Sequence, residues 1–266
     1  MAETARPAII CRDVHITYQI SKPARFALRD VIVRQPKQSR IREVHAVRGI
    51  DLRIDEGELL GVVGPNGSGK STLLRALAGL LPISSGDVDV RTPPTLLGVN
   101  AALRANLSAA QNIRIGCLAA GMARDEVDER FASIVAFADL EEFIDLPLNA
   151  LSSGMRARLH FAIATAVTPD ILFVDEALAV GDTAFRERSW ERIESMRENS
   201  GTIVMVSHNL AEIRRACSRV VWIDKGRVRM DAKPNEVIAA YRDDVAERRA
   251  AREAAQASVD RTAEKN

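Results

Sequence analysis

The stretch VVGPNGSGKSTLL, residues 62–74, decides the fold of this chain. It is rich in glycine, and glycine permits backbone conformations in which several N–H groups turn toward one anion. The spacing from Gly64 to Gly69, followed directly by Lys70 and Ser71, matches the phosphate-binding P-loop. An apolar segment precedes the loop and a helical pattern follows it, which predicts a buried strand and then a helix whose positive N-terminus meets the phosphates. We therefore expect this stretch to bind a nucleoside triphosphate.

The side chains of this loop have distinct expected roles. Lys70 is expected to neutralise the β- and γ-phosphates, and the Ser71 hydroxyl is expected to bind Mg²⁺. The predicted phosphate-binding residues are Gly64, Pro65, Asn66, Gly67, Ser68, Gly69, Lys70, Ser71 and Thr72.

Two further apolar segments end in polar residues. The segment ILFVDE ends in Asp175 and Glu176, and adjacent carboxylates repel one another unless they have a function. In a P-loop protein Asp175 would bind Mg²⁺ and Glu176 would act on an attacking water. The segment TIVMVSHN carries His208 near its end, where a donor to the γ-phosphate would stand, although a histidine at a strand end can also be structural.

The composition limits the classes of partner and compartment. The chain has 266 residues and a formal net charge of +1, so there is no bulk electrostatic argument for a nucleic-acid partner. No apolar run approaches the roughly 20 residues that span a bilayer, and the first residues lack the layout of a secretory signal. The cysteines, Cys11, Cys117 and Cys217, are not in metal-ligand spacing, which suits a reducing cytosol. The sequence predicts a soluble cytoplasmic protein.

The pattern along the chain predicts one α/β domain with two irregular segments. Short apolar runs in the second half are typical of a covered parallel sheet, and residues 100–168 are mostly helical in pattern. Residues 21–45 are polar and basic without a clear period, which indicates an inserted loop. From Asp243 the sequence is rich in Ala, Arg and Glu, which predicts a solvated helix that frays, with an interaction arm as the alternative.

Five motifs in one order give the chain a family resemblance. The P-loop is followed by LSSGM at residues 151–155, in place of an LSGGQ signature, and then by the Asp175-Glu176 pair. ALAVGD at residues 177–182 stands in place of the D-loop, and His208 stands in the switch position. The chain therefore resembles the ATP-binding subunit of an ABC transporter over residues 10–240. No Asn-Lys-x-Asp motif for guanine occurs, which favours ATP over GTP.

The resemblance implies an α/β fold made of a P-loop NTPase core with an ABC-type β-subdomain and an inserted helical subdomain. It divides the chain into an ABC ATPase domain, residues 1–242, and a polar C-terminal helix or tail, residues 243–266. Within the domain the helical subdomain is expected at about residues 100–168 and the basic insertion at about residues 21–45.

The resemblance also implies two copies of the chain that bind ATP and Mg²⁺ head-to-tail. Ser152, Ser153 and Gly154 begin a helix in the signature, and their N–H groups would meet the γ-phosphate held by the other copy. Tyr18 occupies the family position for a ring that stacks on adenine, with His45 as its rival.

The remaining roles follow from the same resemblance. Glu176, His208 and Lys70 would be the catalytic residues, while Ser71 and Asp175 would hold the metal.

The sequences SSGMRARLHFAIA and VDEALAVGD look most like exporters of lipid-linked polysaccharide, such as O-antigen, capsule, teichoic acid or galactan. This similarity implies a separate membrane permease and a peripheral place on the cytoplasmic face of the plasma membrane. Val99 and Asn100 stand where the family has a glutamine. Only 25 residues follow Tyr241, so no appended carbohydrate-binding domain is expected in this sequence. The basic insertion is then either a solvated loop or a surface that faces the permease or the anionic lipid–pyrophosphate end of the substrate.

Three alternatives stay open. An ABC exporter could carry another cargo, such as a drug or lipid. An ABC ATPase could work without a transporter, although such proteins usually carry a long coiled coil or a second ATPase half, which this sequence lacks. A non-catalytic binding module would not need Glu176 and His208.

Overall fold

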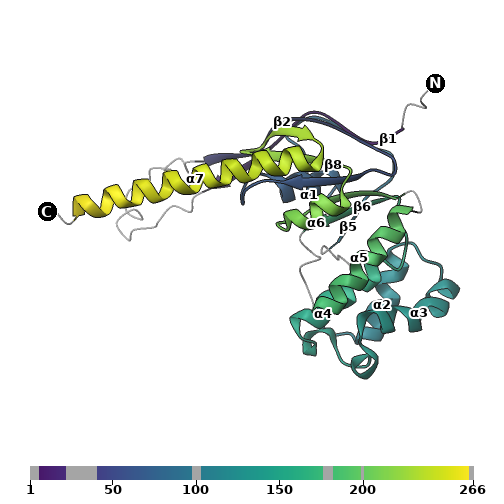
Figure 1. Cartoon of the computed structure of the whole chain (residues 1–266). Coiled ribbons are helices and arrows are strands. Elements are labelled where there is room, and N and C mark those ends of the chain that lie inside the picture. Colours follow the sequence, from purple (N-terminus) through teal and green to yellow (C-terminus); the bar gives the residue numbers. More distant parts are fainter. Residues whose placement is uncertain (1–5, 22–40, 98–102, 176–181, 199–200, 264–266) are drawn as a thin grey trace, which may run out of the picture.

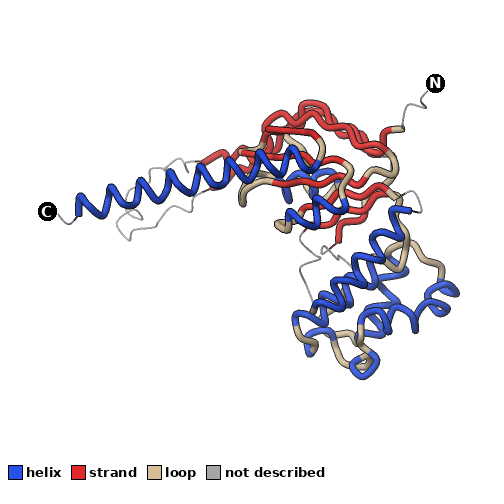
Figure 2. The backbone as a smooth tube through the Cα atoms, viewed as in Figure 1, coloured by secondary structure: helices blue, strands red, loops and turns tan. Residues whose placement is uncertain are grey.

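The computed structural model describes residues 6–21, 41–97, 103–175, 182–198 and 201–263. Within them the chain forms two sheets and several helices (Figure 1, Figure 2). An antiparallel sheet has the strand order β2-β1-β4, and a mixed sheet has the order β5-β6-β7-β3-β8-β9. The strands are β1 Pro7–Ser21, β2 Ile41–Asp55, β3 Leu59–Val63, β4 Ser85–Val90, β5 Thr95–Leu97, β6 Ile171–Asp175, β7 Thr202–Val206, β8 Arg219–Asp224 and β9 Arg227–Ala232. The α-helices are α1 Lys70–Leu77, α2 Ala109–Ala119, α3 Arg124–Ala138, α4 Ser153–Ala164, α5 Thr183–Glu198, α6 Leu210–Ala216 and α7 Pro234–Ala263.

The centre of the mixed sheet is parallel. β3 pairs parallel with both β7 and β8, β6 pairs parallel with β7, and β9 alone pairs antiparallel, with β8. Every residue of β3 and β7 is buried, which explains why LLGVV and TIVMV are continuous apolar runs instead of alternating ones. Because the strands are parallel, the segments that follow β3, β6 and β7 meet at one edge of the sheet.

Each face of this sheet is covered by different elements. On one face the antiparallel sheet and α1 form a core that includes Ile50, Leu74 and Phe173. On the other face α5, α6 and the start of α7 form a second core that includes Ile193 and Val237. Both faces of the mixed sheet are therefore buried, which leaves its carboxyl edge as the place where the segments after β3, β6 and β7 meet.

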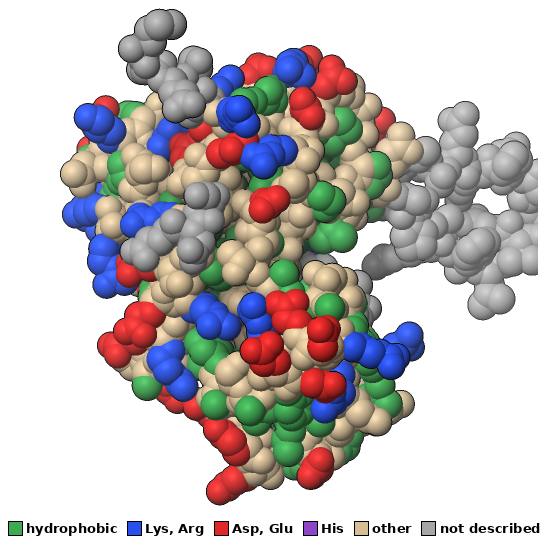
Figure 3. Space-filling model, turned by 90° about the vertical axis from the view of Figure 1, so that its right-hand side faces the viewer, with side chains coloured by type: hydrophobic (Ala, Val, Ile, Leu, Met, Phe, Trp, Pro, Cys, Tyr) green, Lys and Arg blue, Asp and Glu red, His purple; other side chains and the backbone are tan. Residues whose placement is uncertain are grey.

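The helices α2, α3 and α4 form a separate lobe with its own apolar core. The entry to α2 is closely specified, because Ser108 and Gln111 form a capping box. The side chain of Asn112 is fully buried and bonds the backbone of Arg104, Leu107 and Ser108 at 2.7–3.0 Å. In Figure 3, where acidic and basic side chains are interspersed on the visible face, a waist separates this lobe from the sheets.

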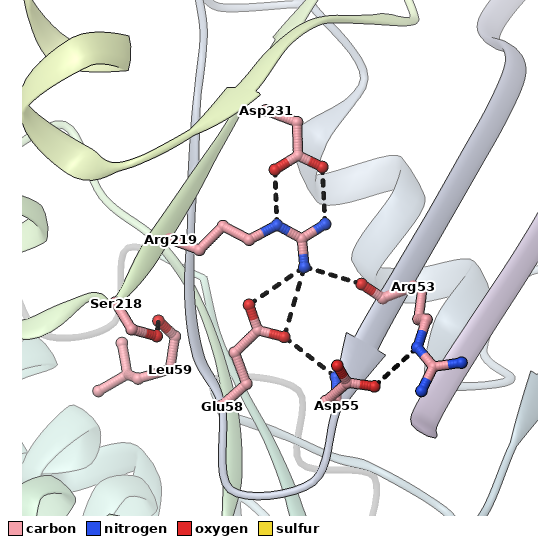
Figure 4. Close-up of polar contacts among 7 residues, drawn as sticks. All are labelled: Arg53, Asp55, Glu58, Leu59, Ser218, Arg219 and Asp231. Carbon is pink, nitrogen blue, oxygen red and sulfur yellow. Dashed lines mark hydrogen bonds and ion pairs between the residues drawn. The ribbon is translucent and has the colours of Figure 1, made fainter. Parts of the chain in front are cut away.

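Polar residues close the amino edge of the sheet, away from the loop after β3 (Figure 4). Arg219 donates two hydrogen bonds of 2.6 Å to Asp231 and contacts Glu58 and the backbone oxygen of Arg53. Glu58 in turn accepts a hydrogen bond from the backbone N–H of Asp55. One guanidinium therefore joins β2, the turn before β3, β8 and β9.

Two expectations from the sequence need correction. Residues 41–45, expected in the inserted loop, are strand: β2 begins at Ile41 and pairs with β1 as far as Ser21. The C-terminal helix begins at Pro234, within the domain, and not near Asp243. Pro234 is a favoured first helical residue, and Val237 and Ile238 are fully buried, so packing fixes the start of α7. The division of the chain at residue 242 stays a prediction.

None of the helices among the described residues is both long enough and apolar enough to cross a membrane.

Candidate nucleotide-binding site

The P-loop connects β3 to α1 at the carboxyl edge of the sheet, as the sequence predicted. Two of its glycines are required by close backbone contacts. A Cβ on Gly64 would clash with the carbonyl oxygen of Ile223, and a Cβ on Gly69 would clash with that of Ala46. Gly67 has space around it but a φ of +78°, a conformation that other residues adopt with strain. The loop is therefore wedged between β2 and the end of β8.

Lys70 is the first residue of α1 and is only 6% exposed. Its Nζ donates hydrogen bonds to the backbone oxygens of Gly64 at 2.9 Å and Pro65 at 3.0 Å. These bonds bend the lysine back across the loop, so its positive charge lies beside the N-terminal turn of α1. A buried ammonium next to the N–H groups of a helix N-terminus favours an anion at this place.

Ser71 and Asp175 meet at the same edge. Ser71 is the second residue of α1 and Asp175 is the last residue of β6, and Ser71 Oγ donates a hydrogen bond of 3.1 Å to Asp175 Oδ1. A hydroxyl and a carboxylate are hard oxygen ligands of the kind that Mg²⁺ prefers. The described residues hold no group of three or more His, Cys, Asp or Glu suited to a metal. Two protein oxygens fit Mg²⁺ in a nucleotide site, where phosphates and waters complete the shell.

His208 lies two residues beyond β7. Val206, the last residue of β7, pairs with Asp175, so His208 follows the strand next to the one that carries Asp175. Asn209 caps α6 by accepting hydrogen bonds from Ala211 and Glu212. This turn holds His208 at the carboxyl edge of the sheet.

Thr17 and His45 face each other across the β1–β2 ribbon. Thr17 Oγ1 lies 2.9 Å from His45 Nδ1, so both side chains lie on one face of the ribbon. Tyr18 follows Thr17 in the strand and, because successive side chains alternate, lies on the opposite face. His45 and Tyr18 therefore lie on opposite faces of the ribbon.

The face that carries Tyr18 is the face of Ile16, which pairs with Val47 across the ribbon. Val47 Cγ2 lies 3.6 Å from the place where a Cβ of Gly69 would stand, so this face turns toward the P-loop. Tyr18 itself is 37% exposed. This geometry favours Tyr18 over His45 as the adenine contact, and that role stays a prediction.

The start of α4 presents a second set of N–H groups. Ser152 is its N-cap, with Oγ accepting a hydrogen bond of 3.2 Å from the backbone N–H of Met155. A hydroxyl that accepts one hydrogen bond still has its own proton to donate. Ser152 and Ser153 are exposed, and a Cβ added to Gly154 would have no neighbouring atom within 4 Å. This helix end is accessible from outside the chain.

The family model for the ABC transporter matches residues 47–179, half of the chain. The chain belongs to the ABC transporter family. The predicted fold class is thereby confirmed: a P-loop core, an antiparallel subdomain and an inserted helical lobe.

Curated relatives place the chain near export ATPases of this ABC family. It is 42% identical over 202 residues to the teichoic acids export ATP-binding protein TagH of Shouchella clausii, covering 76% of this chain and 56% of that one. It is 44% identical over 201 residues to the O-antigen export system ATP-binding protein RfbB of Myxococcus xanthus, covering 75% and 46%. The match thus spans about half the length of these curated relatives.

Solved ABC structures share the fold. An ATP-binding subunit of an ABC transporter superposes with a TM-score of 0.70 at 18% identity, covering 88% of this chain and 93% of that one. The ATP-binding cassette MJ0796, in a dimeric post-hydrolysis state bound to ADP and Pi, superposes with a TM-score of 0.69 at 22% identity, covering 85% and 98%.

The structure brings together the P-loop, Ser71 and Asp175, with His208 at the same sheet edge. Glu176, most of the expected D-loop and the Val99-Asn100 pair lie outside the described residues. Sequence reasoning missed Asp139, which ends α3 and receives hydrogen bonds from Arg158 and Arg188. The only sequence signal was an aspartate just beyond a helical pattern.

Proposed function

We propose that this ABC protein is the ATP-hydrolysing subunit of an exporter of lipid-linked polysaccharide. The observation that carries the proposal is the joint placement of Lys70, Ser71 and Asp175 around the P-loop. It is supported by similarity to relatives that are named for teichoic acid and O-antigen export.

ATP binding would follow from the charges and N–H groups of the loop. Lys70 offsets the negative charge of the phosphates, and the first N–H groups of α1 donate to their oxygens. Tyr18 stacks on the adenine from the β1–β2 ribbon. Ser71 and Asp175 would hold Mg²⁺, which supplies positive charge that offsets the charge of the phosphate oxygens.

Hydrolysis needs a group that orients water and a group that stabilises the transferring phosphoryl. Glu176, next to Asp175, accepts a proton from the attacking water. His208 donates to a phosphate oxygen as charge spreads in the transition state. Glu176 is the residue directly after Asp175, with which β6 ends.

The second nucleotide contact would come from a second copy of the chain. Ser152, Ser153 and Gly154 are accessible at the start of α4, and a head-to-tail dimer would set them against the γ-phosphate. The similar cassette MJ0796 is described as dimeric. Such a dimer would act with a separate permease on the cytoplasmic face of the plasma membrane.

The test has two parts. The purified protein is assayed for Mg²⁺-dependent phosphate release from ATP, with Glu176→Gln as the inactive variant and Glu187→Gln, an exposed carboxylate on α5, as the control. The Glu176→Gln change is then placed in the source organism and its cell-surface polysaccharide is quantified. Phosphate release from ATP with unchanged surface polysaccharide would reject the cargo and retain the ATPase. No phosphate release by the wild type would reject the ATPase.

A further inference from the structure

The turn that connects β8 to β9 packs against the backbone of the P-loop. The backbone N–H of Gly226 donates a hydrogen bond of 2.9 Å to the backbone oxygen of Ser68, in the middle of the P-loop. The oxygen of Gly226 accepts a hydrogen bond of 2.8 Å from the N–H of Arg48 in β2. The oxygen of Ile223, just before the turn, is the atom that excludes a side chain at Gly64. The turn therefore touches the loop at its beginning and in its middle.

This turn has little freedom to change its shape. Lys225 and Gly226 both have positive φ, at +50° and +80°, as a two-residue hairpin of type I′ requires. A Cβ on Gly226 would stand 2.7 Å from the oxygen of Ala46. Because the backbone of Gly226 is bonded to both the P-loop and β2, a shift of the ends of the turn would be transmitted to the P-loop.

Four charged side chains hold the start of this turn to α7. Arg248 of α7 donates to Asp224 at 2.6 and 3.3 Å, and its Nε lies 2.7 Å from Asp244. Arg229 of β9 donates to Asp244 at 2.7 Å and lies 3.6 Å from Asp224. The hydrogen bond from Arg248 lowers the pKa of the Asp224 carboxyl. We call these four residues the α7 cluster.

The carboxylates of the α7 cluster are sheltered, whereas the side chains of Arg248 and Arg229 are 35% and 47% exposed. The side chains of Asp224 and Asp244 are only 12% and 11% exposed. Its two carboxylates balance two guanidiniums, so removal of either arginine leaves a poorly hydrated carboxylate with one partner fewer. Loss of a partner of Asp224 would affect the turn directly, because Asp224 is both the last residue of β8 and the first residue of the turn.

The cluster is also a place where α7 is fixed to the domain. Val237 and Ile238 are buried at the start of the helix. Arg248, about four helical turns after Pro234, bonds Asp224 at the β8–β9 connection. Beyond this point α7 projects away from the sheets (Figure 1). A partner that binds the projecting part of α7 would therefore act first on the cluster and, through the cluster and the β8–β9 turn, on the P-loop.

We propose that Asp224 and Arg248 are positioning residues for the nucleotide: by holding the β8–β9 turn against the P-loop, they make ATP affinity depend on α7. This inference rests on the proposed binding of ATP at the P-loop. The two residues act through the turn, so their removal weakens ATP binding indirectly.

The test compares ATP binding by the full chain and its variants by calorimetry with Mg²⁺, at a temperature where thermal unfolding shows all of them folded. Arg248→Ala and the isosteric Asp224→Asn are expected to weaken ATP binding by on the order of tenfold, as for coupled charged networks. The double variant Asp224→Asn with Arg248→Ala is expected to lose little more affinity than either single variant, because the two residues act through one pair. The control is Arg249→Ala, because Arg249 pairs with Glu253 on the exposed side of the same helix. KM for ATP should rise with the loss of affinity while kcat changes less.

Each outcome decides the inference. Folded Arg248→Ala and Asp224→Asn proteins with the ATP affinity of the wild type would overturn it and leave the cluster a purely structural one, even if their melting temperatures fall. An equal loss in Arg249→Ala would also overturn it, because the effect would then be general to α7. Absence of ATP binding by the wild type would instead overturn the proposed function on which the inference rests.

Discussion

Ser71 Oγ lies 3.1 Å from Asp175 Oδ1, although 104 positions separate the two residues along the chain. Ser71 reaches this place from the first turn of α1, and Asp175 reaches it from the end of β6. β6 is joined to β3 only through β7, so the contact depends on the order of three parallel strands. The oxygen pair is thus a product of the fold and lies beside the P-loop.

Lys70→Ala is expected to weaken ATP binding by at least about tenfold, because the phosphates lose a charge-assisted contact. Lys70 Nζ is held in the loop by hydrogen bonds to the backbone oxygens of Gly64 and Pro65. Titration with a fluorescent ATP analogue measures the change. Lys233→Ala removes an exposed lysine before α7 and should bind ATP normally. Equal affinities for Lys70→Ala and the wild type would contradict the role of Lys70.

Glu176→Gln is expected to bind ATP but to stall as a closed ATP-bound dimer. The change removes the carboxylate that we propose acts on water and leaves Lys70, Ser71 and Asp175 in place. Size-exclusion chromatography with light scattering, with and without ATP and Mg²⁺, measures the assembly. A monomer that hydrolyses ATP at the wild-type rate would show that Glu176 is not catalytic.

Tyr18→Ala is expected to weaken ATP binding more than His45→Ala does. Stacking of a base on an aromatic ring is worth about 1–3 kcal/mol, and Tyr18 lies on the face of the ribbon that turns toward Gly69. His45 is instead bonded to Thr17 on the other face. Parallel titrations of the two variants provide the comparison. A greater loss in His45→Ala would assign the adenine contact to His45.

The sequence was sufficient to predict the elements around the P-loop, because each prediction rested on local chemistry. The three glycines and Lys70 identify the loop, and continuous apolar runs identify β3, β6 and β7 as covered parallel strands. The capping role of Ser152 also follows from its place before a helical pattern. These features need no knowledge of what lies opposite in space.

Features that depend on distant partners could not be predicted. Residues 41–45 stand at the end of a segment that is polar and basic as a whole, yet they are strand because they pair with β1 along the ribbon. Asp224 and Arg248 look like ordinary surface charges in the sequence, and only the folding of α7 onto β8 brings them together. The same applies to Asp139, whose arginine partners lie on α4 and α5.

Arg219→Ala is expected to destabilise the protein by about 1–3 kcal/mol with little effect on ATP affinity, because hydrogen bonds between charged groups are lost. Arg219 joins Asp231 and Glu58 at the amino edge of the sheet (Figure 4), whereas the nucleotide site lies at the carboxyl edge. Urea unfolding gives the free energy, and calorimetry gives the affinity. Stability equal to that of an Arg249→Ala control would show that this edge network contributes nothing. A large loss of affinity at normal stability would show that the two edges are coupled.

Asp139→Asn is expected to lower stability near neutral pH and to have little effect in acid. Arg188 donates to Asp139 at 3.0 and 2.5 Å, and this hydrogen bonding lowers the pKa of the Asp139 carboxyl. The folded-state pKa is therefore below the unfolded value near 3.9, so the stabilisation is complete above that value and is lost as pH falls through the folded-state pKa. Asparagine tolerates the φ of +52° found at this residue, so the substitution adds no backbone strain that would change stability by itself.

The measurement for Asp139 is thermal unfolding of the wild type and Asp139→Asn from pH 7 down to the lowest pH at which both remain folded. The difference in melting temperature should be largest at neutral pH and should narrow as the wild-type carboxylate is protonated. Arg188→Ala should show the same pH trend, because it removes the other partner of the same pair. Since the side chain of Asp139 is 41% exposed, added salt should also reduce the difference. A difference that stays constant across the pH range would show that the charge of Asp139 is not what holds α3 to α5.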